Sequence, residues 1–194
     1  VLKGILNGVD YNTWNPETDP FIAARYSAAR LEGKREAKRD LLATIGLPEQ
    51  ALDKPLAGIV SRFVGQKGFD LIADAADRLL SKDIYLVALG SGNPQYEKLF
   101  LDLAAARPDR VGVHIGYNDP LAHKIEAGCD MFLMPSRYEP CGLNQFYSLR
   151  YGTIPVVRAT GGLDDSVDEE TGFKFAEYSG GALLEAVRRA LEAY

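Results

Sequence analysis

A single glutamate, Glu139, lies in a short polar loop where it could act on a phosphorylated sugar. The loop follows the apolar run at residues 130–134, which predicts a strand, and precedes Gly142, where we expect a helix to begin. Ligands bind at the carboxyl ends of parallel strands, and the free N–H groups at the start of a helix attract phosphate. A carboxylate one turn from such an anion site suits a phosphorylated sugar better than a bare phosphate.

Two cations lie in a second loop, between an apolar run at residues 56–60 and a helical pattern that starts at Gly68. Arg62 and Lys67 are five residues apart in this glycine-punctuated segment. Arginine offers a planar fork of donors and lysine a point charge, so the two side chains could close on one diphosphate. The alternative is a pair of unrelated surface charges. Because the chain has no D-x-D motif, a bound diphosphate would be neutralised by these cations and by helix N-termini.

Glycine-containing turns follow two further apolar runs. The turn at 90–92 lacks the third glycine of a dinucleotide fingerprint, because Gln95 stands in its place. This turn and the one at 160–162 are each either a plain turn or a close backbone approach to a nucleotide or sugar. Tyr117 could stack on a base through its ring face or be a half-buried packing residue. The residues of these candidate contacts are Gly90, Ser91, Gly92, Tyr117, Thr160, Gly161 and Gly162.

Metal and thiol chemistry are not indicated. The two histidines, His114 and His123, have no second ligand cluster nearby, and the two cysteines form no C-x-x-C, so we expect no metal site. Cys141 precedes the predicted helix start, where a thiolate would be stabilised. A packing or backbone-contact role is favoured, because no histidine is near it in the sequence. The carboxylates at 164–170 lack EF-hand spacing and are interpreted as a solvated loop.

The composition argues against several classes of function. The 194 residues, 46% hydrophobic and 25% charged, are enough for one well-cored domain. A net charge of −5 argues against a nucleic-acid or anionic-membrane surface, and no apolar run of about 18 residues predicts a membrane span. The cations at 34–39 alternate with carboxylates. This pattern predicts a solvated helix face with the pairs Glu32–Arg35 and Glu36–Arg39.

The elements that position these residues follow a repeating strand–helix pattern. Residues 1–26 are rich in turn formers and are expected to be a loop or an extended lead-in. A helix over about 31–45 follows, with Ser27 as its candidate N-cap and Gly46 at its end. Beyond it, predicted strands cover 56–60, 84–89, 111–115, 130–134 and 154–157, and predicted helices cover 68–82, 94–106, 119–127, 142–152 and 180–193.

Near-continuous apolar strands that alternate with amphipathic helices predict an α/β fold with a doubly wound, Rossmann-like parallel sheet covered on both faces. The helix that begins at Gly142 carries Leu143, Phe146 and Leu149, which we expect to pack back on the sheet. Both predicted phosphate-binding loops then lie at the carboxyl ends of strands, where ligands bind in such folds.

Longer motifs show that the chain resembles the glycogen/starch synthase family. The central motif, E-P-C-G-L-N-Q at 139–145, is followed by S-L-R-Y-G-T-I-P-V-V and T-G-G-L. Upstream, in order, are G-I-L-N-G-V-D at 4–10, W-N-P-E-T-D-P at 14–20, S-R-F-V-G-Q-K-G-F-D at 61–70, G-S-G at 90–92 and I-G-Y at 115–117. The resemblance covers nearly the whole chain and implies the C-terminal, donor-nucleotide-binding half of the two-domain GT-B fold.

Members of that family transfer glucose from ADP-glucose, or UDP-glucose in some relatives, to the non-reducing end of an α-1,4-glucan with retention. By the resemblance, Arg62 and Lys67 would bind the diphosphate and stabilise the leaving group. Glu139 would hold the donor glucose hydroxyls near the reacting centre, and Tyr117 would stack near the adenine. No cofactor is implied, because ADP-glucose is a substrate. The backbone around Cys141, Gly142, Leu143 and Asn144 would receive the distal phosphate and the sugar.

The resemblance also implies a domain organisation. Residues 1–26 would be an interdomain lead-in and 27–194 the nucleotide-sugar-binding domain, with the N-terminal domain that binds the glucan absent from this chain. The chain alone is therefore expected to be inactive, and its location to be cytoplasmic in a bacterium or plastidic in a plant. A non-catalytic nucleotide- or glucan-binding module of GT-B descent stays open as an alternative. A sugar-nucleotide epimerase is disfavoured by E-P-C-G-L-N-Q.

Overall fold

A six-stranded parallel sheet forms the centre of the computed structural model, which describes residues 4–5 and 7–194. The remaining positions of the predicted lead-in, 1–3 and 6, lie outside the described residues. The strands are β1 (Leu56–Val60), β2 (Tyr85–Gly90), β3 (Val111–Ile115), β4 (Met131–Met134), β5 (Ile154–Arg158) and β6 (Phe173–Phe175).

The strand order is β3-β2-β1-β4-β5-β6, and each neighbouring pair is parallel. The chain runs outward from β1 to β3 and then returns to place β4 on the other side of β1. Two register pairs, Ala57 with Met131 and Gly58 with Phe132, join the halves. The change of direction opens a crevice at the carboxyl ends of β1 and β4. The predicted Rossmann-like sheet is confirmed.

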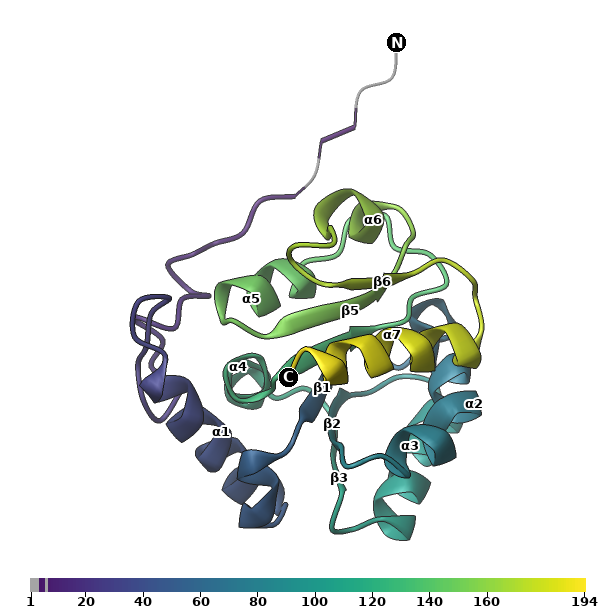
Figure 1. Cartoon of the computed structure of the whole chain (residues 1–194), viewed down its shortest axis with the longest axis horizontal. Helices are drawn as coiled ribbons and strands as arrows, with labels where there is room; N and C mark the ends of the chain where they lie inside the picture. The colour runs from purple at the N-terminus through teal and green to yellow at the C-terminus, as the bar shows by residue number, and fades with distance from the viewer. Residues whose placement is uncertain (1–3, 6) are drawn as a thin grey trace.

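Helices cover both faces of the sheet (Figure 1). One face is packed by α2, α3 and α7 around Phe69, Phe100 and Leu183, and the other by α1 and α4 around Leu41 and Ile125. The α-helices are α1 (Glu32–Ile45), α2 (Phe69–Leu80), α3 (Pro94–Ala106), α4 (Asp119–Gly128), α5 (Asn144–Arg150), α6 (Gly162–Ser166) and α7 (Gly180–Glu192). Two short 3₁₀ helices are η1 (Glu49–Asp53) and η2 (Gly65–Lys67).

The predicted strands and helices are all present, and most bounds agree to within two residues. β6 and α6 were not predicted, and the acidic segment interpreted as a loop is helical where α6 overlaps it. The prediction of Ser27 as an N-cap is wrong. Ser27 pairs with Arg30 in an isolated bridge, and Leu31 occupies the N-cap without a side-chain hydrogen bond.

One of the two predicted charge pairs on α1 forms. Glu36 pairs with Arg39. The predicted pairing of Arg35 with Glu32 is wrong, because the guanidinium of Arg35 instead donates to Asp53 of η1 at 2.7 Å. Sequence spacing within one helix could not reveal this competing carboxylate, which the fold brings in from outside the helix.

The buried face of α5 is more polar than the sequence suggested. The three apolar side chains expected to pack back on the sheet, Leu143, Phe146 and Leu149, are only half-buried. The fully buried side chains of this helix are Gln145 and Ser148. Gln145 donates to the backbone just before the helix, and Ser148 donates to a carboxyl group of α4. Because buried polar groups need partners, hydrogen bonds fix this helix in place.

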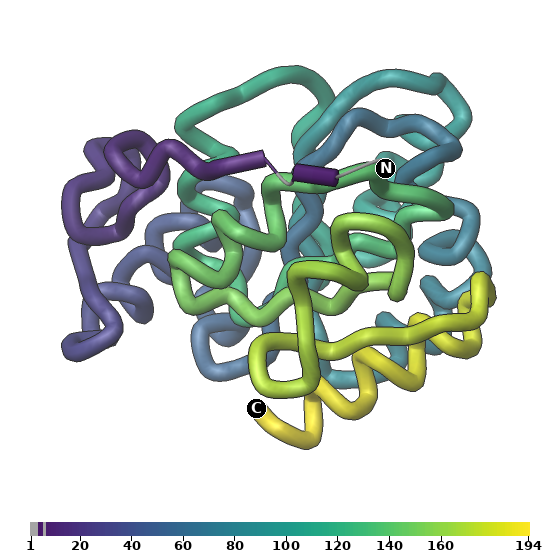
Figure 2. The backbone as a smooth tube through the Cα atoms, turned by 90° about the horizontal axis from the view of Figure 1, so that it is seen from above, coloured from purple at the N-terminus to yellow at the C-terminus, as the bar shows by residue number. Residues whose placement is uncertain are grey.

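The lead-in segment packs beside α1 and against α4 and α5 (Figure 1 and Figure 2). The indole of Trp14 is stacked between two rings, His123 of α4 at 3.8 Å and Tyr147 of α5 at 4.0 Å between centroids. Stacked aromatic pairs contribute roughly 0.5–1.5 kcal/mol beyond the burial of their area. Trp14 therefore links α4 and α5, which are separate in the sequence.

A buried carboxylate supports the same contact. Asp19 is 2% exposed and accepts hydrogen bonds from His123 Nδ1 at 2.7 Å and from the Tyr151 hydroxyl at 2.5 Å. Burial alone would raise the pKa of Asp19, but these hydrogen bonds to the charged form outweigh it and lower the pKa. The second ring nitrogen of His123, Nε2, is buried without a hydrogen-bond partner among the described residues.

Candidate functional site

An ion pair between Lys67 and Glu139 lies at the carboxyl edge of the sheet. Lys67 ends η2, which follows β1, and Glu139 lies in the loop that follows β4. The Lys67 Nζ is 2.5 Å from Glu139 Oε2, and the two side chains are 20% and 8% exposed. The hydroxyl of Ser136 is 3.3 Å from the same carboxylate oxygen. The fold thus brings together two residues predicted as catalytic that are 72 positions apart.

The two loops that carry this pair are tied to each other by their backbones. The backbone N–H of Arg137 donates to the carbonyl of Gln66 at 2.8 Å, and the Gln66 side chain donates to the carbonyl of Tyr138 at 3.2 Å. Gly68 has a positive φ of 74°, and a side chain there would collide with the Pro135 carbonyl. The loops are therefore held in a fixed arrangement before any ligand binds.

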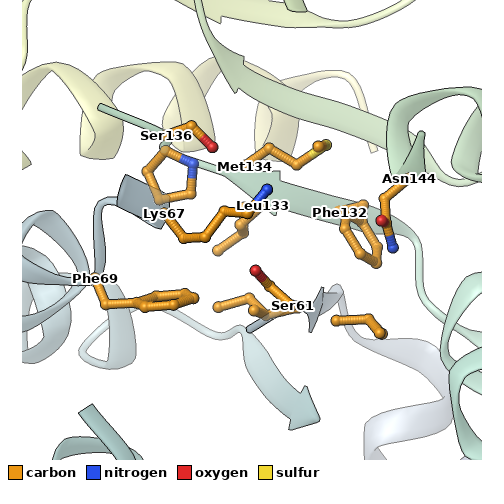
Figure 3. Close-up of a pocket in the computed structure, with 11 residues that line it drawn as sticks. Ser61, Lys67, Phe69, Phe132, Leu133, Met134, Ser136 and Asn144 are labelled. Carbon is orange, nitrogen blue, oxygen red and sulfur yellow. The ribbon is translucent and has the colours of Figure 1, made fainter. Parts of the chain in front are cut away.

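A small cavity of about 20 Å³ adjoins the ion pair (Figure 3). Figure 3 shows Lys67 and Asn144 on opposite sides of it. Ser61 and Ser136 contribute the other polar side chains of its lining. A volume of this size holds about one water-sized group. Polar groups from the loops after β1 and β4, from η2 and from α5 therefore converge on a space that fits a single hydroxyl.

A larger pocket of about 230 Å³ lies next to this cavity, and Val60, Ser61 and Asn144 line both. It extends across the ends of β1, β2 and β3. Arg62 lies on its wall, with an exposed side chain, as does Tyr117. Tyr117 is 89% exposed, so its interpretation as a half-buried packing residue is wrong. The other predicted contacts that line the pocket are Gly90 and Ser91.

Two of the glycines predicted to contact a nucleotide lie against the protein's own backbone. A side chain at Gly90 would collide with the carbonyl of Ser61, and Gly92 pairs with Phe63 in an isolated bridge. In this structure these two glycines therefore allow the loop after β1 to lie against the end of β2. Contact between this turn and a nucleotide stays a prediction.

The turn at residues 160–162 supports the loop of the carboxylate. The N–H of Gly162 donates to the carbonyl of Glu139 at 2.9 Å, and a side chain at Gly161 would collide with that carbonyl. Thr160 precedes these glycines and is half-buried. The turn thus fixes the backbone of Glu139, and its contact with a ligand stays a prediction.

The segment before α5 differs in detail from the prediction. The helix begins at Asn144 rather than at Gly142, and Leu143 is its N-cap without a side-chain hydrogen bond. Cys141 is half-buried, and its sulfur accepts from the backbone N–H of Asn7 at 3.3 Å. These contacts are of the kind expected for a backbone-contact cysteine. The binding of phosphate by this segment stays a prediction.

One polar residue beneath the site was not predicted from the sequence. Glu126 of α4 is fully buried and accepts from the side-chain amide of Asn144 at 3.1 Å and from Ser148 at 2.8 Å. Burial raises the pKa of Glu126 to about 8, although both hydrogen bonds act in the opposite direction. A sequence signal was available, because this acid is four positions after Ala122 and three before Cys129 and so falls on an apolar helix face.

The described residues contain no group of three His, Cys, Asp or Glu side chains that could hold a metal ion. They also contain no helix with the length and apolar character needed to cross a membrane.

Comparisons with known proteins place the chain among glycosyl transferases. The family described as "Glycosyl transferases group 1" matches residues 48–194. Glycogen synthase from Koribacter versatilis is 59% identical, and glycogen synthase 1 from Geobacter metallireducens is 58% identical, each over the whole of this chain. The chain spans only 41% and 40% of the length of these two relatives.

Solved structures agree with the sequence comparison. The catalytic domain of starch synthase IV from Arabidopsis thaliana, bound to ADP and acarbose, superposes with a TM-score of 0.91 at 38% identity. The match covers 98% of this chain and 41% of that one. A sucrose-phosphate synthase from Thermosynechococcus elongatus matches over 79% of this chain with a TM-score of 0.64 and 26% identity. The resemblance to glycogen and starch synthases seen in the sequence motifs is confirmed.

Proposed function

The chain belongs to the family of glycosyl transferases group 1, and we propose that it is the donor-binding domain of a retaining glucosyltransferase that elongates an α-1,4-glucan from ADP-glucose. The observation that carries the proposal is the Lys67–Glu139 ion pair, 2.5 Å long, beside a pocket walled by Arg62 and Tyr117. The glycogen synthases that resemble the chain and the ADP-bound starch synthase support the choice of donor and product.

The proposed roles follow from charge and position. Transfer of glucose from ADP-glucose leaves negative charge on the diphosphate, so fixed cations lower the barrier. Arg62 is exposed at the pocket, where its guanidinium can bind two phosphate oxygens. Lys67 pairs with Glu139 and lines the small cavity next to the pocket, so its positive charge is close to the proposed site of the diphosphate. Glu139 is buried and rigidly held, as required of a group that orients sugar hydroxyls beside the bond that breaks.

The remaining contacts of the donor are proposed from the same pocket. Tyr117 would stack on the adenine, Gly90, Ser91 and Gly92 would lie beside the nucleotide, and Thr160, Gly161 and Gly162 beside the sugar. The segment Cys141, Gly142, Leu143 and Asn144 would receive the distal phosphate and the sugar. We propose that ADP-glucose is a substrate and that no separate cofactor takes part.

The domain organisation is part of the proposal. Residues 1–26 would form the lead-in between domains and 27–194 the donor domain, with the glucan bound by a domain that this chain does not contain. The chain spans 41% and 40% of the length of two glycogen synthases, which is consistent with one domain of two. We therefore expect the 194-residue chain to bind ADP without transferring glucose.

The test measures glucose transfer to glycogen by the full-length protein that carries this chain. Arg62→Ala and Lys67→Ala should each lower kcat about a hundredfold, which corresponds to roughly 3 kcal/mol for one lost charge-stabilising donor. Glu139→Ala should lower kcat more than it weakens donor binding. Arg78→Ala, on the exposed side of α2, is the matched control and should leave turnover unchanged. Unchanged turnover in the first three variants would overturn the proposed roles.

Calorimetric titration of the chain with ADP, UDP and NAD identifies the nucleotide. Binding of ADP at least about tenfold tighter than that of UDP, a difference of about 1.4 kcal/mol, supports an ADP-glucose donor. Nucleotide binding that does not depend on Arg62, combined with no transfer by the full-length protein, would instead indicate a non-catalytic binding module.

A further inference from the structure

The proposed reaction leaves one buried carboxyl group without a role. Glu126 of α4 has no exposed surface and makes both of its side-chain hydrogen bonds to α5. Its Oε1 accepts from the amide nitrogen of Asn144, and its Oε2 accepts from the hydroxyl of Ser148. These partners are four positions apart, so they lie on one face of α5. A single carboxyl group therefore fixes the first turn of this helix.

The position of Asn144 connects Glu126 to the pocket. Asn144 lines both the small cavity beside Lys67 and the larger pocket, and Figure 3 shows its side chain at the edge of the small cavity. The amide nitrogen is held by Glu126, which determines which way the amide plane faces. Loss of the carboxyl group would free the amide to rotate, and the pocket would lose one preset polar contact.

The charge state of Glu126 is set by its surroundings. No cation forms an ion pair with it among the described residues; the nearby, partly buried amine of Lys34, on α1, donates instead to the carbonyls of Ala127 and Tyr151 and to Thr153 Oγ1. Burial raises the pKa of Glu126 to about 8 and lowers the pKa of Lys34 to about 8.

The other titratable groups that face Glu126 are uncharged at neutral pH. They are Tyr26 of the lead-in, Cys129 after α4, Tyr147 of α5 and Tyr151 after it. Burial raises the pKa of each of these groups, so none of them loses its proton before Glu126 does. Among Lys34 and these four groups, only Lys34 has a pKa near that of Glu126, so the experiment needs a control for Lys34.

We propose that Glu126 is a positioning residue for the donor: as a neutral acid it fixes Asn144 at the pocket, and when it ionises it places a negative charge beneath the site of the diphosphate and weakens donor binding. This inference rests on the proposed function. It assigns a pH response of donor affinity to a residue outside the Lys67–Glu139 pair.

The test measures KM for ADP-glucose and kcat between pH 6.5 and about 9, with glycogen as acceptor and the full-length protein. For the wild type, KM should rise about tenfold as pH rises through about 8, with a smaller change in kcat. Glu126→Gln keeps the shape but cannot ionise: its Oε1 can still accept from Asn144, and its Nε2 can donate to the Ser148 hydroxyl. Its KM at pH 7 should therefore match the wild type and stay constant up to pH 9. Glu126→Leu should raise KM several-fold at every pH.

Two control variants complete the design. Glu185→Gln, on exposed α7, should reproduce the wild-type profile. Lys34→Met should retain the rise in KM. The inference is overturned if the rise in KM survives in Glu126→Gln. If the rise also disappears in Lys34→Met in that case, the pH response belongs to Lys34. Glu126→Gln decides the question even if Glu126→Leu fails to fold, which circular dichroism would reveal. A wild-type protein that transfers no glucose from ADP-glucose or UDP-glucose refutes the proposed function itself, and this inference with it.

Discussion

Replacing Lys67 by Met should destabilise the chain through the carboxylate that it leaves behind. At 2.5 Å and an effective dielectric constant of about 20, the gross attraction in the Lys67–Glu139 pair is about 7 kcal/mol. Desolvation of both groups offsets most of this attraction. Removing one partner of a buried pair costs about 3–5 kcal/mol, and the 20% exposure of Lys67 reduces that figure. We expect Lys67→Met to lower the free energy of unfolding by about 2–3 kcal/mol.

A double-mutant cycle separates this effect from general damage. Glu139→Gln removes the charge that Lys67 neutralises, and the partly exposed amine can turn to water, so this variant should lose less than about 1 kcal/mol. The double variant Lys67→Met/Glu139→Gln has no unpaired charge and should recover most of the stability that Lys67→Met loses. Recovery of stability should not restore turnover, because the proposed reaction uses both side chains.

Urea denaturation of the 194-residue chain, followed by circular dichroism, measures all four proteins. Lys98→Met is the matched control, because Lys98 pairs with Asp102 on the exposed side of α3, and it should change stability by less than about 0.5 kcal/mol. If Lys67→Met is as stable as the wild type, or if the two single changes simply add in the double variant, the ion pair does not couple the loops in the way described.

Three further predictions follow from particular contacts. Burial raises the folded-state pKa of Glu126 to about 8, so its contribution to stability is full below its unfolded pKa and is lost as pH rises towards about 8. Glu126→Gln does not undergo this loss. In urea titrations it should be as stable as the wild type near pH 4 and more stable by up to about 3 kcal/mol at pH 7. Trp14→Ala removes the ring stacked between His123 and Tyr147 and should lower the free energy of unfolding by about 2–3 kcal/mol; an unchanged thermal midpoint would show that the lead-in does not support the domain. Tyr117→Ala should leave stability within about 0.5 kcal/mol, because the ring is 89% exposed, while weakening ADP binding about tenfold by calorimetry; equal affinity would remove the ring from the site.

Much of the sheet could be predicted because its strands are buried on both faces. β1, β2 and β4 are continuous apolar runs, and such runs between glycine and proline signals are hard to mistake. β6 is only three residues long, and the alternation Phe173, Lys174, Phe175 is too short to predict a strand. Short edge strands depend on their neighbour rather than on their own pattern, so the sequence alone could not reveal this one.

The charged groups of the site could be predicted individually, but their contacts could not. Arg62, Lys67 and Glu139 follow strands, which places them at one edge of the sheet. Their pairing depends on the order of the strands, because β1 and β4 are neighbours only in the folded sheet. The inward face of α5 was predicted from its apolar residues, but Gln145 and Ser148 occupy it and donate hydrogen bonds to partners that are distant in the chain.

The junction between β1 and β4 also bears on when the site forms during folding. Within each half of the sheet, strands pair with strands that are near them in the chain, whereas this junction joins Ala57 to Met131. Closing so long a loop costs entropy before the new contacts form, so we expect each half to gain order first. Lys67 and Glu139 lie on opposite sides of the junction. An intermediate with two ordered but undocked halves would keep the cation and the carboxylate apart. The proposed binding of nucleotide would then arise only in the last step of assembly and would report on its completion.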